Sequence, residues 1–529
     1  MKSMLSIAVA FCLLVLPSSL LAGGRIDPAG IGGSIVISGM GRPVEAHAPF
    51  FELAGGKEAK VVILRFDTHE SSQGETAQLL EAWEAAGGRS IQVLQIRAGV
   101  ETAADVSVVE KASGVWLVAG GPEKLTAERV GGRLKEALGK LVAGGGVAGG
   151  SGAAGDAFAG ELGLLPSSFV DTQQSIRFSA SPVRQALEER PSLVGFEIEM
   201  DAALIVSGRR MRAVGGGDGD SKVQIHLAAS ERREARVIEL GRFRDGADLT
   251  ALRKAAIERA ADEPFPADEP PSPEVENGTL IIIGGGGMPS GIIPKFVELA
   301  GGEEGSIVVF PTANPDPLPE KPGIEVAFRK AGAKEVTVLA GRSLDQVESD
   351  DYLDVLRRAT GLWFGGGRQW RFADAYLDTQ ALEEMHGVLA RGGVIMGSSA
   401  GASIQADYLA RANPLGNRDI MAEGYERGLG FIKGVAIDQH FAQRRRFRDM
   451  TSLVDRYPQL LGIGIDEGTA LIVQGKIGTV EGRSEVHFYD RRKPVTGGQP
   501  DYESVGDGGS YDLVDRKILE TGEPARPGK

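Results

Sequence analysis

The two halves of this chain repeat one another in the same order. Segment 50–56 (FFELAGG) matches 296–302 (FVELAGG), and each leads into an apolar strand. Three further pairs follow the same order: 33–41 with 278–286, 114–117 with 361–364, and 202–206 with 469–473. An internal repeat of this length predicts two copies of one fold. The length of 529 residues agrees, because it is too great for a single hydrophobic core.

Within each half, apolar strands alternate with helical patterns. The strand-like runs include 61–64 and 307–310, and the helix candidates are 79–86, 126–141, 381–390 and 447–461. This alternation predicts an α/β fold with a doubly wound parallel sheet covered on both faces. Segment 262–276 is acidic and rich in proline, which is typical of an extended linker. We therefore expect domains at 23–261 and 278–529, joined by a linker at 262–277.

The N-terminus has the pattern of an export signal. Lys2 precedes an apolar run at 4–16, which is short for a membrane span, and Ala22 offers a small residue before a cleavage site. We expect residues 1–22 to be a signal peptide, the protein to be secreted or periplasmic, and no stable membrane anchor to remain. The only cysteine, Cys12, lies in this segment, so the mature chain would have no disulfide and no thiolate metal site. A net charge of −14 argues against nucleic acid as a partner.

Segment 392–403 (GGVIMGSSAGAS) has the pattern of a nucleophile elbow. An apolar strand at 394–396 runs into a turn of small residues, and we expect a helix at 402–410. A G-x-S-x-G turn between strand and helix exposes the serine hydroxyl, here that of Ser399, at the edge of the sheet. The N–H group of Ala400 would then face a developing oxyanion. The alternative is a small-residue turn without chemistry.

A serine nucleophile needs a base, and of the six histidines His440 is the best placed. It follows an apolar strand at 435–437, whereas His386 lies in a predicted helix and His226 and His487 lie in strand-like runs. Asp466 and Glu467 follow another apolar run and could orient the histidine. Serine, histidine and acid would then meet at strand ends, which form the active edge of such sheets.

Four motifs in this order resemble the cyanophycinases, in the serine peptidase group that also includes the aspartyl dipeptidases. The family shows G-T-S-A-G-A, G-G-x-Q, D-Q-H-F-x-Q-R-x-R and G-I-D-E-x-T-A. Here these read GSSAGA at 397–402, GGRQ at 366–369, DQHFAQRRR at 438–446 and GIDEGTA at 464–470. The resemblance covers 278–490 and implies a fold like that of class I glutamine amidotransferases, which is flavodoxin-like.

The resemblance implies a triad of Ser399, His440 and Glu467 that cleaves peptide bonds through an acyl-enzyme. The N–H groups of Ala400 and of the Gly367 region would form the oxyanion hole. The family's substrate is cyanophycin, a polyaspartate with arginine on each side-chain carboxyl, and its product is β-aspartyl-arginine. The positions matching the family's substrate-binding residues are Gln369, Asp438, Gln439, Arg444 and Arg446. No metal or cofactor is implied, and the expected partner is a polymer or peptide rich in Asp and Arg.

This sequence departs from the family at two positions. Arg368 stands where aspartate is usual in the G-G-x-Q turn, and Asp449 stands where a further arginine is usual, with Arg448 one place earlier. Arg368 or Arg448 could supply the missing charge from another angle. Two alternatives stay open: an aspartyl dipeptidase or other exopeptidase on the same fold, and a binding protein without catalysis.

The first half lacks the catalytic residues. Aligning Val147 with Val394 pairs Ser399 with Gly152 and Gln369 with Pro122. Aligning Gly195 with Gly462 gives the remaining pairs: Asp438 with Asp171, His440 with Gln173, Arg446 with Ser179 and Glu467 with Met200. We expect an inactive domain that forms an intramolecular pseudo-dimer with the active one. The alternative is a module that holds a polymer for the second half.

Overall fold

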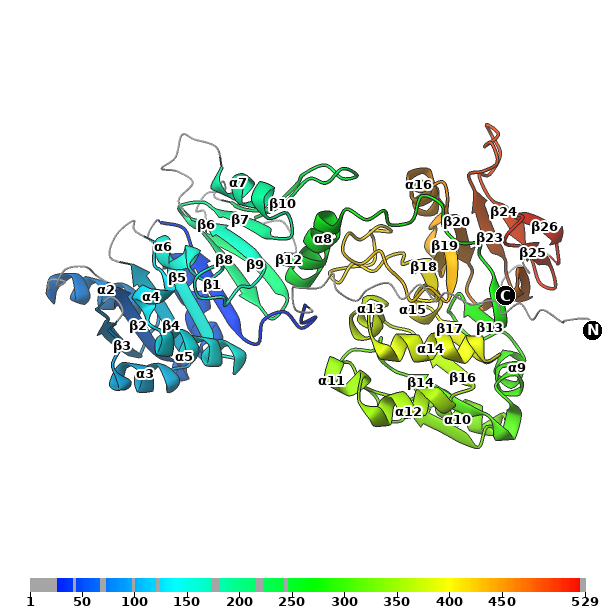
Figure 1. Cartoon of the computed structure of the whole chain (residues 1–529), viewed down its shortest axis with the longest axis horizontal. Helices are drawn as coiled ribbons and strands as arrows, with labels where there is room; N and C mark the ends of the chain where they lie inside the picture. The colour runs from blue at the N-terminus through cyan, green and yellow to red at the C-terminus, as the bar shows by residue number, and fades with distance from the viewer. Residues whose placement is uncertain are drawn as a thin grey trace, which may run out of the picture.

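The computed structural model shows two lobes side by side, one from each half of the chain (Figure 1). It describes residues 26–40, 44–66, 73–97, 100–119, 124–172, 181–215, 222–241 and 246–523. The expected signal peptide lies outside these ranges. Among the described residues, no helix is both long enough and apolar enough to cross a membrane.

The first lobe contains two sheets. The larger has the order β12-β9-β8-β1-β5-β4-β2-β3. Its strands are β1 (Ser34–Ser38), β2 (Lys60–Phe66), β3 (Ser90–Gln95), β4 (Gly114–Ala119), β5 (Val147–Ser151), β8 (Ala202–Ser207), β9 (Arg210–Gly215) and β12 (Ala247–Asp248). The smaller sheet consists of β11 (Arg236–Leu240), β10 (Val223–Leu227), β7 (Val194–Ile198) and β6 (Ser168–Asp171). The helices are α1 (Val44–Leu53), α2 (Gln73–Ala85), α3 (Ala103–Glu110), α4 (Ala127–Val130), α5 (Gly132–Ala143), α6 (Ala153–Asp156), α7 (Pro182–Glu189) and α8 (Leu249–Ala261).

The second lobe also contains two sheets. The larger has the order β15-β14-β16-β17-β13-β21-β22-β25-β26. Its strands are β13 (Val275–Ile283), β14 (Ser306–Phe310), β15 (Glu335–Val338), β16 (Gly361–Phe364), β17 (Val394–Ser398), β21 (Thr469–Gly475), β22 (Ile477–Gly482), β25 (Ser510–Asp512) and β26 (Lys517–Glu520). The smaller consists of β18 (Ala406–Tyr408), β19 (Ile432–Gln439), β20 (Leu461–Ile465), β23 (Val486–Asp490) and β24 (Glu503–Val505). The helices are α9 (Ile292–Leu299), α10 (Gly323–Lys330), α11 (Leu344–Val347), α12 (Asp350–Arg358), α13 (Trp370–Tyr376), α14 (Gln380–Ala390), α15 (Ala400–Ser403) and α16 (Phe447–Arg456).

The two large sheets share one strand order. Read from the β3 edge the first is β3-β2-β4-β5-β1-β8-β9, and read from the β15 edge the second is β15-β14-β16-β17-β13-β21-β22. In both, the first five strands are parallel, the sixth is antiparallel to them, and the seventh pairs antiparallel with the sixth. The fold is therefore mixed α/β. The expected parallel sheet is present in its first five strands, and β21 and β22 extend it as an antiparallel hairpin.

Apolar clusters cover both faces of the second large sheet. On one face Phe296 of α9 and Phe328 of α10 pack against strand residues such as Val309. On the other face, side chains of α12 and α14, among them Leu356 and Met385, join a second cluster. The burial of both faces accounts for the nearly continuous apolar runs of the central strands.

Three helix predictions need correction. The expected helix at 402–410 is only α15, because the chain then enters the second sheet as β18, which pairs with β19. The expected helix at 126–141 is split into α4 and α5 at Gly131, which has a φ of 90°. The helix expected at 447–461 ends at Arg456, two residues before a proline, since the residue before a proline disfavours helical backbone.

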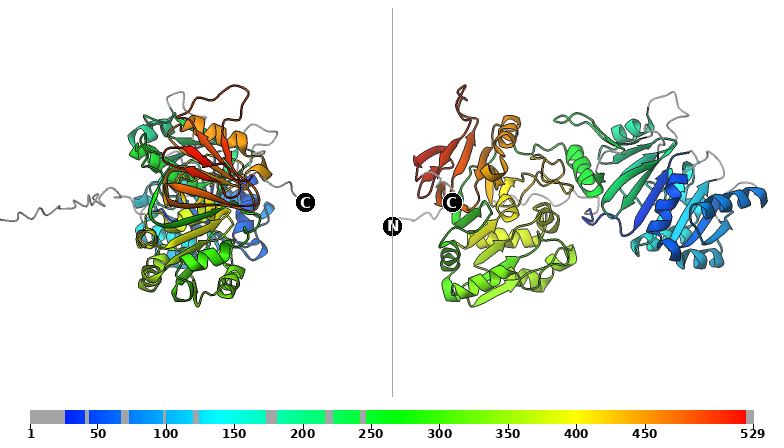
Figure 2. Two further views of the ribbon diagram at one scale, coloured as in Figure 1. Left: turned by 90° about the vertical axis from the view of Figure 1, so that its right-hand side faces the viewer. Right: turned by 180° about the vertical axis from the view of Figure 1, so that it is seen from behind.

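The segment between the lobes packs against the second lobe instead of running free. Strand β13 begins at Val275, so the last residues of the expected linker belong to the sheet. Phe265 stacks on Tyr408 with ring centroids 6.2 Å apart, and Gln459 donates to the carbonyl oxygen of Ala267. Figure 2 shows α8 lying between the lobes from behind. The C-terminal stretch, to which the sequence assigned no role, supplies β24, β25 and β26 at the sheet edges.

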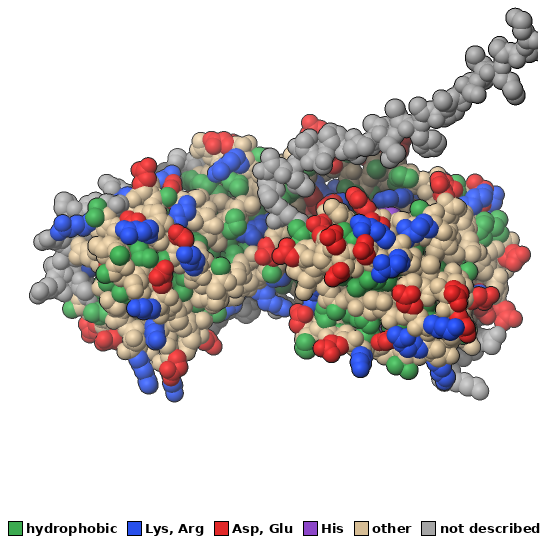
Figure 3. Space-filling view, turned by 60° about the horizontal axis from the view of Figure 1, so that its bottom comes forward, with side chains coloured by type: hydrophobic (Ala, Val, Ile, Leu, Met, Phe, Trp, Pro, Cys, Tyr) green, Lys and Arg blue, Asp and Glu red, His purple; other side chains and the backbone are tan. Residues whose placement is uncertain are grey.

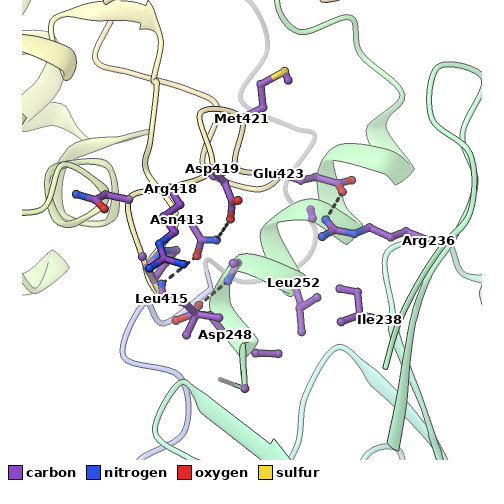
Figure 4. Close-up of a pocket in the computed structure, with 18 of the residues that line it drawn as sticks. Arg236, Ile238, Asp248, Leu252, Asn413, Leu415, Arg418, Asp419, Met421 and Glu423 are labelled. Atoms are coloured by element: carbon purple, nitrogen blue, oxygen red, sulfur yellow. Dashed lines mark hydrogen bonds and ion pairs between the residues drawn. The ribbon is translucent and has the colours of Figure 1, made fainter. Parts of the chain in front are cut away.

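Charged side chains of α8 and the first lobe hold segment 408–427 of the second lobe. Arg259 donates to Glu423 and to two first-lobe carbonyl groups, and Arg233 pairs with both Glu423 and Glu426. A β-carbon on Gly424 would lie 2.3 Å from the carbonyl oxygen of Ala251 in α8, so only glycine allows this approach. Both lobes line a cavity of about 940 Å³ beside this contact, where Arg236 reaches Glu423 (Figure 4).

Candidate active site

The predicted elbow lies between β17 and α15. Ser399 has a φ of 55°, a backbone conformation that residues other than glycine rarely adopt. Its N–H group donates to the carbonyl oxygen of Ile283 at 3.1 Å, which fixes the turn against the neighbouring strand β13. The hydroxyl is therefore held at the carboxyl edge of the parallel strands.

Both glycines of the G-x-S-x-G pattern are required for steric reasons. A β-carbon on Gly397 would lie 2.0 Å from the carbonyl oxygen of Gly401, and one on Gly401 would lie 2.0 Å from that of Phe364. Either would overlap with backbone atoms that cannot move aside. The close approach of these backbones is what allows the turn to be sharp.

The structure brings the three predicted triad residues together. His440 Nε2 lies 2.9 Å from Ser399 Oγ, and His440 Nδ1 lies 2.6 Å from Glu467 Oε1. His440 follows β19 and Glu467 follows β20, so adjacent parallel strands deliver both groups to one edge. A proton on Nδ1 that is donated to Glu467 leaves Nε2 as the acceptor for the serine hydroxyl. This geometry suits general-base activation of Ser399.

Burial lowers the pKa of His440 below its ordinary value, and the hydrogen bond to Glu467 opposes this by favouring the imidazolium form. Arg444 and Arg446 lower the pKa further through their positive charges. The imidazole is therefore neutral at neutral pH, as a base must be, while Glu467 stabilises it once it takes a proton.

A glycine-rich loop after β13 covers the histidine and its carboxylate, and the sequence did not assign it a role. A β-carbon on Gly285 would lie 2.3 Å from Cε1 of His440, and one on Gly286 would lie 2.3 Å from Oε2 of Glu467. The carbonyl oxygen of Gly284 accepts a hydrogen bond from the N–H of His440 at 2.8 Å. The repeat marked this segment in the sequence, but only its contacts reveal that it positions the dyad.

Asp466, the other predicted carboxylate, points inward. Its Oδ1 accepts a hydrogen bond from the N–H of Ala442 at 2.9 Å, and its Oδ2 accepts one from Ser484 at 2.7 Å. Oε1 of Gln443 in turn accepts a hydrogen bond from the N–H of Glu467 at 2.9 Å. These bonds join the turn after His440 to the turn that carries Glu467. The position of the two carboxylates at a strand end did not distinguish them, and the resemblance alone assigned Glu467 to the triad.

Gln369 and Asp438, to which the resemblance assigns substrate binding, are buried in this structure. The side-chain amide of Gln369 donates to the carbonyl oxygens of Ala410 and Arg411, at 2.8 and 3.0 Å. Asp438 is 0% exposed, and both of its oxygens accept hydrogen bonds from arginines of this chain. Neither side chain is open to a ligand in this arrangement, because close packing fills the space in front of it.

The other predicted binding residues divide into buried and open groups. Arg446 is buried and paired with Asp438, and burial lowers its pKa to about 10 although Asp438 opposes this. Arg444 is exposed beside His440. Gln439 is buried, and its Oε1 has no hydrogen-bond partner, which leaves an acceptor at the end of β19. Arg444 is therefore the member of the set that is exposed.

The turn predicted to complete the oxyanion hole lies beside the serine. A β-carbon on Gly366 would be 3.5 Å from Cβ of Ser399. Gly367 has a φ of 140° and lies against Ala313, whose carbonyl oxygen accepts a hydrogen bond from the N–H of Arg368. The side chain of Arg368 turns away to donate to the carbonyl oxygens of Asn413 and Gly416. It therefore anchors the loop that lines the cavity between the lobes.

The described part of the chain contains no group of three histidine, cysteine or acidic side chains arranged to hold a metal ion. A serine on a strained elbow, a histidine within hydrogen-bond reach and a carboxylate behind it define a serine-type peptidase.

The comparisons with known proteins agree. The family model described as peptidase family S51 matches residues 280–480. A cyanophycinase of Geminocystis herdmanii is 32% identical over 187 residues, which is 35% of this chain and 68% of that protein. Those of Thermosynechococcus vestitus and Trichormus variabilis are 31% and 30% identical over 38% of this chain, and the match covers 63% and 70% of their lengths.

This chain belongs to peptidase family S51, the family of these cyanophycinases. A crystal structure of a peptidase from an acI-B1 Actinobacterium is also similar, with 21% identity, a TM-score of 0.33, and coverage of 45% of this chain and 97% of that one. The family match falls in the second half, where the elbow, His440 and Glu467 lie.

Proposed function

We propose that the second half hydrolyses cyanophycin to β-aspartyl-arginine dipeptides, with Ser399 as nucleophile, His440 as general base and Glu467 as its orienting acid. The observation that carries this proposal is the hydrogen-bond chain from Ser399 Oγ through the imidazole to Glu467. The similarity to cyanophycinases supports the substrate.

The reaction follows from the positions of these groups. Ser399 Oγ attacks the scissile carbonyl carbon while Nε2 of His440 takes the hydroxyl proton. The oxyanion of the tetrahedral intermediate faces the N–H groups of Ala400 and of the Gly367 turn. His440 then gives its proton to the leaving amine, and an acyl-enzyme forms. Water, activated by the same histidine, releases the acid and restores the serine.

The first half is proposed to be an inactive copy of the same flavodoxin-like domain, forming a pseudo-dimer with residues 278–529. The shared strand order of the two large sheets supports this, as does Gly152 at the place of Ser399. We favour a scaffold role because α8 and the first lobe hold segment 408–427 through several charged contacts. The alternative, a module that holds the polymer, would use the cavity between the lobes.

Export through residues 1–22 is part of the proposal. It would bring the enzyme to polymer outside the cytoplasm, and it rests on the sequence pattern of the N-terminus. Sequencing the N-terminus of protein recovered from a periplasmic or culture fraction tests it. A start at Gly23 is expected, and a chain that begins at Met1 would contradict it.

The test of the activity is dipeptide release from insoluble cyanophycin by the mature chain, with Ser399→Ala as the control. Release of β-aspartyl-arginine that the variant loses would support both nucleophile and substrate. Hydrolysis of dipeptides that begin with an α-linked aspartate, but not of the polymer, would favour the aspartyl dipeptidase alternative. A folded protein that neither cleaves these substrates nor reacts with a fluorophosphonate at Ser399 would favour a binding protein without catalysis.

A further inference from the structure

Arg209 of the first lobe reaches across to the helix that follows the oxyanion turn, as we call residues 366–368. It lies in the turn between β8 and β9, and its side chain is 15% exposed. It binds Asp248 of its own lobe through two hydrogen bonds, from Nε at 2.6 Å and from Nη2 at 2.9 Å. Nη1 donates to the carbonyl oxygen of Pro28 at 3.1 Å and, in the second lobe, to Asp374 at 2.8 Å. The forked pair with Asp248 fixes the plane of the guanidinium, so that Nη1 is held toward the second lobe.

Asp374 is the acceptor on the second lobe. It belongs to α13, which begins at Trp370 directly after the oxyanion turn, on the side of the second lobe that faces the first (Figure 1). Its side chain is 8% exposed, and its Oδ1 accepts a hydrogen bond from Lys254 of α8 at 2.6 Å. The hydroxyl of Tyr425 accepts from Arg209 at 2.5 Å and donates to Asp374 at 2.7 Å. Two cations of the first half thus neutralise a carboxylate that is almost fully buried in the second.

A second route joins Arg209 to the oxyanion turn through the ring of Trp370. The guanidinium carbon of Arg209 lies 4.4 Å from the centroid of this ring, and that of Arg371 lies 4.9 Å from it. Nη1 of Arg371 donates to the carbonyl oxygen of Ala313 at 2.9 Å. The same oxygen lies against Gly367, where a β-carbon would approach it to 2.2 Å. Packed groups therefore connect Arg209 with the oxyanion turn.

The charge of Arg209 does not depend on pH in the range where the enzyme would work. Burial disfavours this charge, but the hydrogen bond to Asp248 and the nearby carboxylates raise the pKa of Arg209 above its ordinary value. The guanidinium therefore stays charged while His440 titrates. Any effect of Arg209 on the rate should consequently be the same on both sides of that titration.

Arg259 is a second buried arginine at the boundary between the lobes, and it serves for comparison. Its side chain is 4% exposed, and it donates to Glu423 and to the carbonyl oxygens of Ala228 and Glu234. Among the described residues, its hydrogen bonds do not include α13. The two arginines therefore hold different parts of the second lobe.

We infer that Arg209 is a positioning residue for catalysis, because it holds α13 and thereby keeps the N–H groups of the oxyanion turn in place. The inference rests on the proposed roles of Ser399 and Gly367, and it gives the first half a share in the rate of the reaction. Without Arg209 the nucleophile and its base stay where they are, but the donors shift. Such a shift weakens the binding of the oxyanion in the transition state and leaves the binding of the substrate unchanged.

The test measures kcat and KM on a short oligo-aspartate whose side-chain carboxyls carry arginine. Arg209→Met should lower kcat by about thirtyfold and leave KM within about twofold, since misplaced donors act only in the transition state. Arg209→Lys keeps the charge without the fork and should lower kcat by only about fivefold. Arg259→Met is the matched control and should change kcat by less than about twofold, because Glu423 lies outside α13. Wild-type kcat in a folded Arg209→Met chain would overturn the inference, as would a rise in KM alone.

The pH profile and a second variant distinguish positioning from a general loss of stability. The acid limb of kcat/KM should stay at the same pH in Arg209→Met, and a shift would overturn the inference because it would mean an effect on His440. Asp374→Asn keeps the shape of the acceptor and should lower kcat by about tenfold, which also serves if Arg209→Met fails to fold. The losses from Asp374→Asn and Arg209→Met should not add in the double variant, since the two residues act through one contact. Additive losses would count against that contact.

Fluorophosphonate labelling separates failure of the inference from failure of the proposed function. Oγ of Ser399 forms a bond to phosphorus and fluoride leaves, while the oxyanion turn stabilises the charged oxygen on phosphorus, so the labelling rate does not depend on the substrate. If the wild-type chain is labelled but does not cleave the oligomer, the proposed substrate is wrong. Labelling that is slower by about tenfold in Arg209→Met, and not in Arg259→Met, would still support the inference. Cleavage of the oligomer with equal labelling rates in both variants would leave the proposed function intact and overturn the inference.

Discussion

The two halves form the same turn at the same strand end, and only the second half has a serine hydroxyl there. Ser399 has φ and ψ of 55° and −113°, and Gly152 has 55° and −135°. Each donates its N–H to the last residue of the neighbouring parallel strand, Ile283 in one case and Ser38 in the other. The strained backbone therefore belongs to the fold, because it also occurs at Gly152, which has no hydroxyl group.

The two turns differ in the residues around them, at the positions that in the second half hold the histidine loop and the acid. Met40 and Met200 of the first half occupy the positions of Gly285 and Glu467, and both methionines are partly exposed. The close contact that precedes them survives: a β-carbon on Gly39 would lie 2.1 Å from the carbonyl oxygen of Glu199, as one on Gly284 would lie 2.2 Å from that of Asp466. The backbone frame is common to both, and the side chains that activate a serine are not.

The largest effect should come from the nucleophile itself. Ser399→Ala should lower hydrolysis by about 10⁴-fold or more, because the acyl-enzyme can no longer form. The matched change, Gly152→Ser, places a hydroxyl on the other elbow and should add no activity when combined with Ser399→Ala. Product release and fluorophosphonate labelling should be measured for Ser399→Ala and for the double variant. Activity from the double variant would show that the first half retains a base.

Replacing the orienting acid, Glu467, should have the second-largest effect on catalysis. Glu467→Gln should lower kcat by about 10³-fold, because an amide cannot stabilise the imidazolium as a carboxylate does. Since Glu467 raises the pKa of His440 against the effect of burial, its loss should lower that pKa further. The acid limb of the kcat/KM profile should then move to lower pH. A shift to higher pH would contradict the proposed role of Glu467, and Met200→Gln in the first half is the control.

The glycine loop over the dyad should show an effect of intermediate size. Gly285→Ala should cost about a hundredfold in kcat, since its β-carbon must displace the His440 ring and a shift near 1 Å disrupts the attack geometry. Met40→Ala at the matching place should leave activity unchanged. Equal kcat for Gly285→Ala and wild type would mean that the loop moves away during the reaction.

The smallest effect on catalysis should come from the contact of α8 with Glu423. Arg259→Met removes a buried hydrogen bond to Glu423 and should lower the free energy of unfolding by about 3 kcal/mol. Calorimetry should then separate the unfolding of the two halves, while kcat on a short oligomer changes less than about twofold. Arg232→Ala, at the exposed pair with Asp268, is the control that should leave the unfolding midpoint unchanged.

Arg259→Met also decides whether the first half is a scaffold or a module that holds the polymer. If the first half is a scaffold, the variant should lose hydrolytic activity equally on the polymer and on short oligomers, because both activities depend only on the stability of the second lobe. A larger loss on the polymer would favour the module that holds it. Figure 3 shows that the molecule narrows between the two lobes.

Local sequence patterns were sufficient for the main elements of the fold and the site. Helix α14 and the strand runs at 61–64 and 307–310 follow from periodicity, since each buries one continuous apolar surface. The spacing of small residues at 397–401 indicated the elbow, and glycine is needed at 397 and 401 because a β-carbon there would overlap with neighbouring backbone. The order of serine, histidine and acid at strand ends predicted that the three would meet, since parallel strands share one edge.

Only the tertiary structure could decide which polar groups are occupied. Asp438 and Glu467 look alike in the sequence, each at a strand end, but one is enclosed by two arginines and the other lies behind the imidazole. The short α15 was likewise unpredictable, because β18 pairs with a strand far along the chain. Patterns record what a residue can do locally, whereas burial and pairing depend on distant segments. The chain alone thus determined the elbow and the order of the catalytic groups, and packing decided which carboxylate is free to act.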